Sequence, residues 1–309
     1  MSEPSPPRLP RTTPSGDAVP FRSTGVGRQW LGDLYPRLLT ASWPAILLLL
    51  VAGYVLTNAI FAGLYLAGGD CINATEPGSL LQAFSFAVQT LSGIGYGAMH
   101  PTTPYAYVVS DVQAFVGLIG LALATGLMFA RFSRPTSRIA FSDGMLVRQR
   151  DGVPFLVFRM ANERGNQLVE ATVTVVALIE ERTAEGERMR RLHDLALVRS
   201  SSPMFTMSWT VLHPLDADSP VHGLARGERP PALIGVIVNV MGVDGTMNQT
   251  VHKQRVYPVD AIHFGRRFVD MVEIGADGQY TLHYGLLGET EPDPVEAARL
   301  EALRSETPD

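Results

Sequence analysis

The residues with the most specific chemical potential form the stretch TLSGIGYGAMHP, residues 90–101. A glycine occupies every second position from Gly93 to Gly97. Because glycine adopts backbone conformations that other residues avoid, such a segment can aim successive carbonyl oxygens at a common axis. Rings of carbonyls built in this way can replace the hydration shell of an ion, and four chains are needed to complete each ring. The stretch therefore predicts an ion filter at residues 93–97.

The same glycine spacing has two other interpretations. A phosphate-binding loop also uses closely spaced glycines, but it requires a preceding strand and a following helix in a soluble βαβ unit. The sequence on both sides of this stretch is apolar instead. A re-entrant turn without any role in transport is the second alternative, and the residues alone leave it open.

Two uncharged apolar runs flank the glycine-rich stretch, because no charged residue occurs from Leu38 to Gly69 or from Val112 to Ala130. An apolar run of about 18 residues or more can cross the hydrocarbon core as a helix. The runs predict membrane spans at 43–66 and 107–130. Residues 79–90 are apolar but too short to span, and irregular backbone at that depth must be buried in protein or line a watery path. We therefore expect a pore helix at 79–90 that leads into a re-entrant filter.

The arginines indicate the orientation of the two spans. Both outer flanks of the pair carry arginines, whereas residues 67–104 contain no Lys or Arg. The flanking arginines are Arg22, Arg28, Arg37, Arg131, Arg134 and Arg138. Because basic residues remain on the cytoplasmic side of a membrane, both termini are predicted to be cytoplasmic.

The remaining composition narrows the classes of function. A formal net charge of −5 and the lack of a basic stripe argue against a nucleic-acid partner. Cys71 is the only cysteine, so the chain can form neither an intrachain disulfide nor a cysteine-rich metal site. The histidines lack metal-ligand spacing, and no nucleophile with a base, paired carboxylates or cofactor loop is recognisable. The sequence predicts no enzyme activity and no resident cofactor.

The chain divides into segments of different composition. Residues 1–27 are rich in Pro, Ser, Thr and Arg and predict a disordered tail. Residues 28–41 carry apolar side chains at helical spacing and predict an interfacial helix, with a kink or late start at Pro36. Residues 42–138 form the predicted membrane module, 139–288 a water-soluble β domain and 289–309 a C-terminal tail.

The β domain is predicted from short segments rich in β-branched and aromatic residues. These segments lie at 155–161, 171–181, 195–199, 207–213, 232–242, 268–274 and 279–284. Asp-Gly pairs at 143–144, 151–152, 244–245 and 277–278 predict hairpin turns. Short strands at this density are typical of a β-sandwich. The expected fold class is a membrane α module followed by an all-β domain.

Two spans, a pore helix, the motif GYG, the sequence ARFSRP and a β-rich domain together resemble the prokaryotic inward-rectifier potassium channel family. Two segments of the β domain add to the resemblance, HDLALVRSSSPMFTMSWTVLHPLDADSP at 193–220 and RRFVDMVEIGADG at 266–278. The resemblance covers about residues 30–286. It implies a homotetramer in the bacterial inner membrane, an immunoglobulin-like cytoplasmic domain and K⁺ as the permeant ion. It also implies gating at the inner mouth, modulated by the cytoplasmic domain and by anionic lipids.

The family pattern carries over onto individual residues. The carbonyls that coordinate K⁺ would belong to Gly93, Ile94, Gly95 and Tyr96, with Gly97 completing the filter. Phe129 matches a bulky residue that narrows the cytoplasmic end, where a ring of four phenylalanines can close a pore by dewetting. A packing or interfacial aromatic is the alternative for Phe129. The other implied positions are Thr90 and Ser92 for filter support, Gln113, Leu121 and Thr125 in the cavity wall, and Arg37, Arg131 and Arg134 at lipid headgroups. Membrane topology alone would explain the arginines equally well.

Two positions depart from the family pattern. The family filter normally reads Thr-x-Gly-Tyr-Gly, with the Thr hydroxyl as a ligand of the innermost site, whereas this chain has Gly93. Leu121 stands where strongly rectifying relatives have an acidic residue, so strong block by polyamines or Mg²⁺ is not expected from this position. Three outcomes stay open: a K⁺-selective channel, a non-conducting membrane sensor or scaffold, and a weakly selective cation channel.

Overall fold

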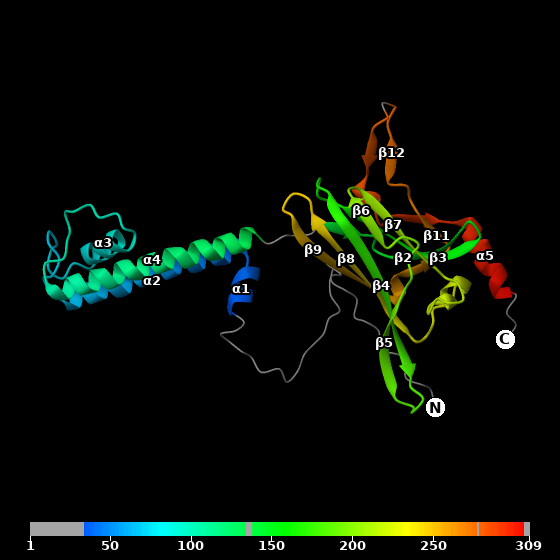
Figure 1. The fold of residues 1–309 in the computed structure, drawn as a ribbon, viewed down its shortest axis with the longest axis horizontal. Helices are drawn as coiled ribbons and strands as arrows, with labels where there is room; N and C mark the ends of the chain where they lie inside the picture. The colour runs from blue at the N-terminus through cyan, green and yellow to red at the C-terminus, as the bar shows by residue number, and fades with distance from the viewer. Residues whose placement is uncertain (1–33, 134–137, 277, 306–309) are drawn as a thin grey trace. The chain divides into compact units, whose positions relative to one another are not determined.

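The structure is a computed structural model that describes residues 34–133, 138–276 and 278–305 (Figure 1). Internal contacts divide these residues into a helical unit before position 135 and a β unit after it. The predicted tail at 1–27, the first part of the predicted interfacial helix and Arg134 lie outside the described residues.

The described helical unit contains α1 Leu34–Thr40, α2 Trp43–Ala67, α3 Leu80–Leu91 and α4 Pro104–Phe132. Helices α2 and α4 are long and apolar enough to cross a membrane. Helix α4 begins earlier than the predicted span at 107–130. Pro104 occupies its first turn, and the Thr103 hydroxyl accepts a hydrogen bond from Ala106 N at 3.2 Å. Both are signals that start a helix.

The longer helices enclose an apolar core beside α3. Its buried members are Phe61, Ala62, Tyr65, Cys71, Ile72, Ala83, Phe86, Ala87, Ala106 and Val109. The connection that follows α2 and the connection that precedes α4 lie side by side. Asn73 N donates to His100 O at 2.9 Å, and Thr102 N donates to Cys71 O at 2.9 Å. These bonds close the re-entrant segment where it leaves α2 and where it enters α4.

The β unit consists of strands of different lengths and ends with a C-terminal helix (Figure 1). They are β1 Ile139–Phe141, β2 Met145–Arg150, β3 Val153–Asn162, β4 Leu168–Arg182, β5 Arg188–Asp194, β6 Ser201–Phe205, β7 Ser208–Pro214, β8 Leu233–Asp244, β9 Gln249–Pro258, β10 Ile262–Phe264, β11 Arg266–Phe268, β12 Val272–Ile274, β13 Tyr280–Leu282, β14 Thr290–Pro292 and α5 Pro294–Ser305.

Two of the sheets form the layers of a sandwich. One has the order β1-β3-β2-β10 with β7 also paired to β3, and the other has the order β5-β4-β8-β9 with β6 also paired to β4. Alternate residues of β4, including Val173, Val175 and Ala177, are buried in a core that both sheets supply. Side chains that alternate between core and solvent are expected when two sheets pack face to face. The predicted β-sandwich is confirmed.

Residues 195–199 were predicted as a strand, and this prediction is wrong. The segment is an irregular connection between β5 and β6. Leu195 N donates to Val175 O at 2.9 Å, and Val198 N donates to Leu212 O at 3.0 Å. Because Val175 and Leu212 belong to different sheets, the segment crosses from one layer to the other. Leu195 is buried in the core at the start of this crossing, whereas Val198 is exposed.

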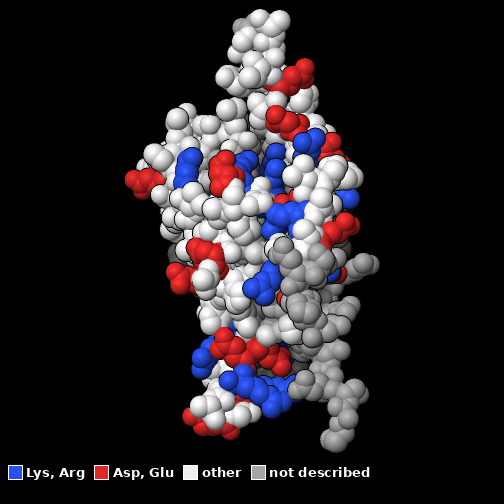
Figure 2. Space-filling view, turned by 90° about the vertical axis from the view of Figure 1, so that its right-hand side faces the viewer, with Lys and Arg blue, Asp and Glu red and all other residues white. Residues whose placement is uncertain are grey.

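The β4–β5 hairpin carries charges of both signs, which Figure 2 shows gathered at the lower end of the view. Arg188 and Arg190 lie 3.7 and 3.8 Å from carboxylate oxygens of Glu180, and His193 lies 2.7 Å from Glu181. The two arginine side chains are at least half exposed, so each such pair contributes little stability. Strand β5 was not predicted because it lies at a sheet edge and its side chains are almost all polar and exposed.

The segment after residue 288 is part of the β domain rather than the predicted tail. Strand β14 pairs antiparallel with β11, and α5 follows. The buried carboxylate of Glu296 accepts a hydrogen bond from Gln149 N at 3.0 Å and forms an ion pair with Arg299. The predicted boundary at 288 is wrong because these contacts use charged side chains, which read as solvent-exposed in a sequence.

His213 of β7 is a buried titratable group in the β unit. Its Nδ1 lies 2.6 Å from Ala196 O and its Nε2 lies 2.8 Å from Ser219 Oγ. Because a carbonyl can only accept, Nδ1 carries the proton of the neutral ring and Nε2 accepts from the serine hydroxyl. Burial lowers the pKa of His213 below its ordinary value, although the Ala196 carbonyl and Asp216 oppose the shift.

We expect the stability of the β unit to fall as the pH drops below the ordinary histidine pKa of about 6.5. The unfolded chain gains a proton there while folded His213 stays neutral, and the loss ends once the pH passes the lower folded-state pKa. Thermal unfolding at about pH 7.5 and about pH 5.5 brackets this range. His213→Gln should weaken this pH dependence and lower the unfolding free energy by about 1–3 kcal/mol, because buried partners lose a hydrogen bond. The exposed His252, changed to Gln, is the control. An unaltered pH dependence in His213→Gln would contradict the assignment.

Candidate functional site

The predicted filter begins where α3 ends. Ser92 closes the helix with φ −84° and ψ −8°. Gly93, Gly95 and Gly97 then adopt φ values of 70°, 57° and 86°, whereas the residues between them do not share this left-handed backbone. Such alternation turns successive peptide planes so that their carbonyls can face one side. A side chain at any of the three positions would strain this backbone, which accounts for the glycines.

A backbone hydrogen bond fastens the filter to α3, because Ile94 N donates to Gln89 O at 3.0 Å. Thr90 and Ser92 were predicted to support the filter with their side chains. Their hydroxyls donate instead to helix carbonyls four residues earlier, at 2.9 and 2.5 Å. Both hydrogen bonds lie within the last turns of α3, and support of the filter by these two residues stays a prediction.

An apolar hollow of about 680 Å³ lies beside the C-terminal end of α3. Residues 90–93 form part of its wall, with Gly53 and Thr57 from α2 and Gly117 and Leu121 from α4. The hollow thus brings Leu121 into the same wall as the first filter residue. An apolar wall offers no charge to a cation that enters it.

Gln113 was predicted to line the cavity, and this prediction is wrong. Its side chain is fully buried within the single chain. The Tyr65 hydroxyl donates to Gln113 Oε1 at 2.8 Å, and Gln113 Nε2 donates to Ala87 O at 2.8 Å. The amide is occupied by contacts between helices, so it cannot face a central pore.

Leu121, Thr125 and Phe129 follow one another at four-residue intervals along α4. Each interval advances by only about 40° around a helix, so the three lie roughly on one face. All three are exposed in the single chain, and the Phe129 side chain is 73% exposed. This face therefore remains exposed among the described residues of the helical unit.

Residues 44–134 match a family model described as "Ion channel", and residues 139–307 match one described as "Inward rectifier potassium channel C-terminal domain". The chain is 40% identical over 281 residues to the inward rectifier potassium channel Kirbac3.1 of Paramagnetospirillum magnetotacticum, covering 91% of this chain and 95% of that relative. The chain belongs to the inward rectifier potassium channel family. The predicted resemblance is confirmed.

Animal relatives match over nearly the same length. The human G protein-activated inward rectifier potassium channel 3 is 28% identical over 298 residues, covering 88% of this chain and 75% of that protein. Inward rectifier potassium channel irk-1 of Caenorhabditis elegans is 28% identical over 291 residues, covering 86% and 53%. The fold of this family, a two-span pore module and a cytoplasmic β-sandwich, matches both units described above.

Arg131 of this inward rectifier family member contacts the C-terminal end of α1. Arg131 donates from its two terminal nitrogens to Leu38 O and Ala41 O, each at 2.6 Å. Its guanidinium also lies 4.8 Å from the ring centroid of Trp43. Arg131 was predicted to meet lipid headgroups, but here it holds the C-terminal end of α1 against α4. Cations at helix C-termini are stabilising because the last carbonyls carry partial negative charge.

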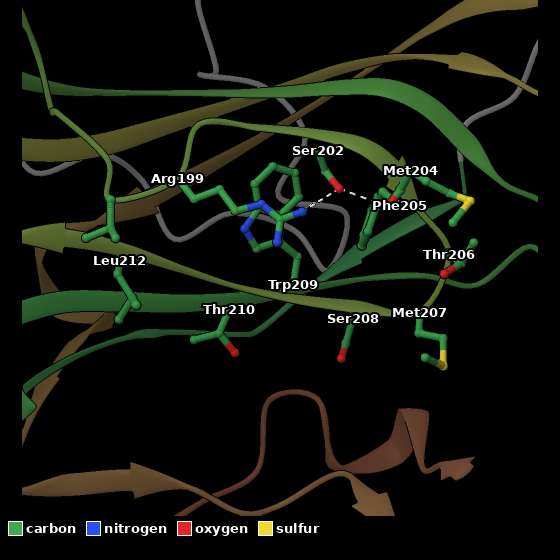
Figure 3. Close-up of a pocket in the computed structure, with 11 residues that line it drawn as sticks. Arg199, Ser202, Met204, Phe205, Thr206, Met207, Ser208, Trp209, Thr210 and Leu212 are labelled. Atoms are coloured by element: carbon green, nitrogen blue, oxygen red, sulfur yellow. Dashed lines mark hydrogen bonds between the residues drawn. The ribbon is translucent and has the colours of Figure 1, made fainter. Parts of the chain in front are cut away.

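The cytoplasmic domain of this family member contains a shallow depression of about 460 Å³ between β6 and β7 (Figure 3). Arg199 is the charged residue of its lining, and its guanidinium lies 4.8 Å from the Trp209 ring centroid and donates to Ser202 Oγ. Met204 and Met207 stand exposed at the rim. No group of three metal-ligating side chains occurs among the residues that the structure describes. The depression thus has exposed apolar residues at its rim, and such residues are often covered by protein–protein contacts.

Replacing Arg131 by Lys should loosen α1 even though the charge is kept, because an ammonium cannot reproduce the two-pronged geometry. We expect backbone hydrogen exchange at residues 34–41 to accelerate by about fivefold to tenfold, as for the net loss of one ordinary hydrogen bond. Mass-spectrometric exchange of the full chain in lipid vesicles measures this. Arg37→Lys serves as the control. Exchange at wild-type rates in Arg131→Lys would show that charge alone matters at this position.

Proposed function

We propose that four copies of the chain assemble around one axis and conduct K⁺ through carbonyl rings of Gly93, Ile94, Gly95 and Tyr96. The observation that carries the proposal is the alternating left-handed backbone at residues 93, 95 and 97, directly after a short helix. Ile94 and Tyr96 are 49% and 75% exposed in the single chain, which leaves the flanks of the filter open to neighbouring copies. Membership of a potassium channel family supports K⁺ as the permeant ion.

Gly93 affects ion binding at the innermost ring of the proposed filter. Without a hydroxyl at this position the innermost ring offers only carbonyl oxygens, so ion binding there should be weaker than in filters that carry Thr. A filter with one weak ring can still select K⁺ through the others. The competing functions are a non-conducting sensor or scaffold and a weakly selective cation channel, both of which follow if the weak ring dominates.

The chain is placed in the membrane by its arginines and gated, in this proposal, at the cytoplasmic end of α4. The arginine distribution supports a bacterial inner membrane location with both termini cytoplasmic. The exposed Phe129, near the end of α4, supports a hydrophobic gate at the cytoplasmic mouth. Arg37 and Arg134 keep the proposed lipid role, in which each basic residue adds about 1 kcal/mol near an anionic surface. Modulation by the cytoplasmic domain would act through the interfacial helix.

The first experiment is ion flux into vesicles of anionic lipid that contain the purified full chain. We expect rubidium uptake that exceeds sodium uptake and that barium blocks, because rubidium and barium both fit carbonyl sites built for K⁺. Empty vesicles are the control. Equal rubidium and sodium uptake would favour the weakly selective channel, and no uptake by a folded tetramer would favour the sensor.

Gly93→Thr adds the hydroxyl ring that the family pattern contains, and Gly93→Ala is its matched control. A β-branched residue resists the φ of 70° found at this position, so threonine must shift the backbone as well as add a ligand. We expect Gly93→Thr to change the single-channel conductance while rubidium preference over sodium is kept. Gly93→Ala introduces the strain without the ligand and should only lower the activity. Identical conductance in wild type and Gly93→Thr would contradict the role given to this position.

Phe129→Ala should raise basal rubidium uptake, because four methyl groups leave a wider and less hydrophobic constriction than four phenyl rings. Phe115→Ala is the control, since Phe115 is a similarly exposed phenylalanine in the outer half of α4. Basal uptake per tetramer in the same vesicles is the measurement. The gate assignment fails if both variants raise uptake equally or neither does.

A further inference from the structure

A buried amide in the membrane module, Gln113 of α4, has no part in the conduction path proposed above. Its side chain is fully buried in a helix long and apolar enough to span a membrane. Polar side chains in such segments are costly unless they are hydrogen-bonded, and they are retained where they serve a function. Asn58 of α2 is also a buried amide, but its Nδ2 donates to Tyr54 O in its own helix at 2.9 Å. Gln113 differs because both ends of its side chain reach other helices.

The contacts of Gln113 form one hydrogen-bonded chain across three helices. Tyr65 of α2 donates its hydroxyl to Gln113 Oε1 at 2.8 Å, and Gln113 Nε2 donates to Ala87 O of α3 at 2.8 Å. Tyr65 is itself 1% exposed. Its ring also meets the Phe86 ring of α3 edge-on, with centroids 4.9 Å apart. The two spanning helices therefore both hold the same turn of α3.

A second contact lies one turn further along both helices. A Cβ atom placed on Gly117 would come within 2.5 Å of Leu91 O, so only glycine permits this approach of α4 to α3. Gln113 and Gly117 are four residues apart on α4, as Ala87 and Leu91 are on α3, so each pair occupies one helix face. Helix α4 thus fixes α3 over the two turns that lead into the filter.

We infer that the chain of Tyr65, Gln113 and the Ala87 carbonyl sets the position of α3 and thereby the width of the filter. This inference rests on the proposed function, and it makes Tyr65 and Gln113 positioning residues for ion selection. A functional site tolerates errors of only about 0.5 Å, so the groups that hold its support decide its selectivity. The dependence is strong in this chain because Gly93 has no side chain to anchor the inner end of the filter.

Tyr65→Phe and Gln113→Leu test the chain, separately and together. Tyr65→Phe removes only the hydroxyl, and Gln113→Leu removes both bonds. We expect the rubidium-to-sodium flux ratio to fall by about twofold to tenfold in each, the range that corresponds to one lost hydrogen bond. The double variant should have the ratio of Gln113→Leu alone, because both changes break the same chain. The barium concentration for half-block, which reports filter geometry independently of channel number, should shift in the same variants.

Ser110→Ala is the matched control, since the Ser110 hydroxyl of α4 donates only to Tyr107 O of its own helix at 2.8 Å. It should leave the flux ratio unchanged. A fall in total flux with an unchanged ratio and barium block in both variants would overturn the inference, since it would mean a purely structural role. Additive effects of the two changes would overturn the single chain.

A second readout separates this inference from the proposed function. If the wild-type protein passes no rubidium, the proposed conduction is overturned. The hydrogen-bonded chain is then tested by thermal unfolding, as the extra stability that potassium gives the tetramer compared with sodium. A smaller stabilisation in Gln113→Leu than in wild type and Ser110→Ala supports the inference, and equal stabilisation overturns it.

Discussion

The helical unit depends on one constraint, which is that the left-handed backbone at residues 93–97 must be held by protein. Irregular backbone at membrane depth is tolerated only where it is covered or lines a watery path. The single chain leaves residues 93–97 exposed and holds them through the segments on either side. The last turn of α3 is closed by its own hydroxyls, the flanking connections bond to each other, and α2 and α4 enclose the pore helix.

Residues spaced four apart along α4 contact the pore helix in the first half of α4 and reach the proposed gate near its end. Gln113 and Gly117 point toward α3 while the pore helix lies alongside. Each four-residue step rotates about 40° around the helix, so Leu121 and Phe129 lie on a face that is exposed in the described helical unit. A displacement of α4 that moved Phe129 would therefore also act on the contacts that hold the filter. The proposed filter and the proposed gate are thus connected through one helix, α4.

Much of this organisation was predictable because it rests on local rules. Alternate glycines, uncharged runs and the Asp151–Gly152 turn, whose φ values of 51° and 82° match a hairpin, each signal their structure within a few residues. Gln113 was assigned to the cavity wall from the family pattern, and its sequence neighbourhood could not correct this, because its partners lie 48 and 26 residues away in the chain. The same reason hid Glu296, whose partner Gln149 is 147 residues distant. Contacts of this kind are set by tertiary packing and leave no periodicity to read.

Gly93 connects these observations. In a filter with threonine at this position, a side chain can ligate the ion and also fix the backbone. Here the left-handed conformation at 93 favours glycine, so the inner end of the filter is held by the backbone bonds of Gly93 N to Thr90 O and of Ile94 N to Gln89 O, and by the packing behind α3. The loss of one side chain at the ion path thereby transfers the task of positioning to residues that never meet an ion. Selectivity in this chain is consequently a property of how three helices are fastened together, more than of any single ring of oxygens.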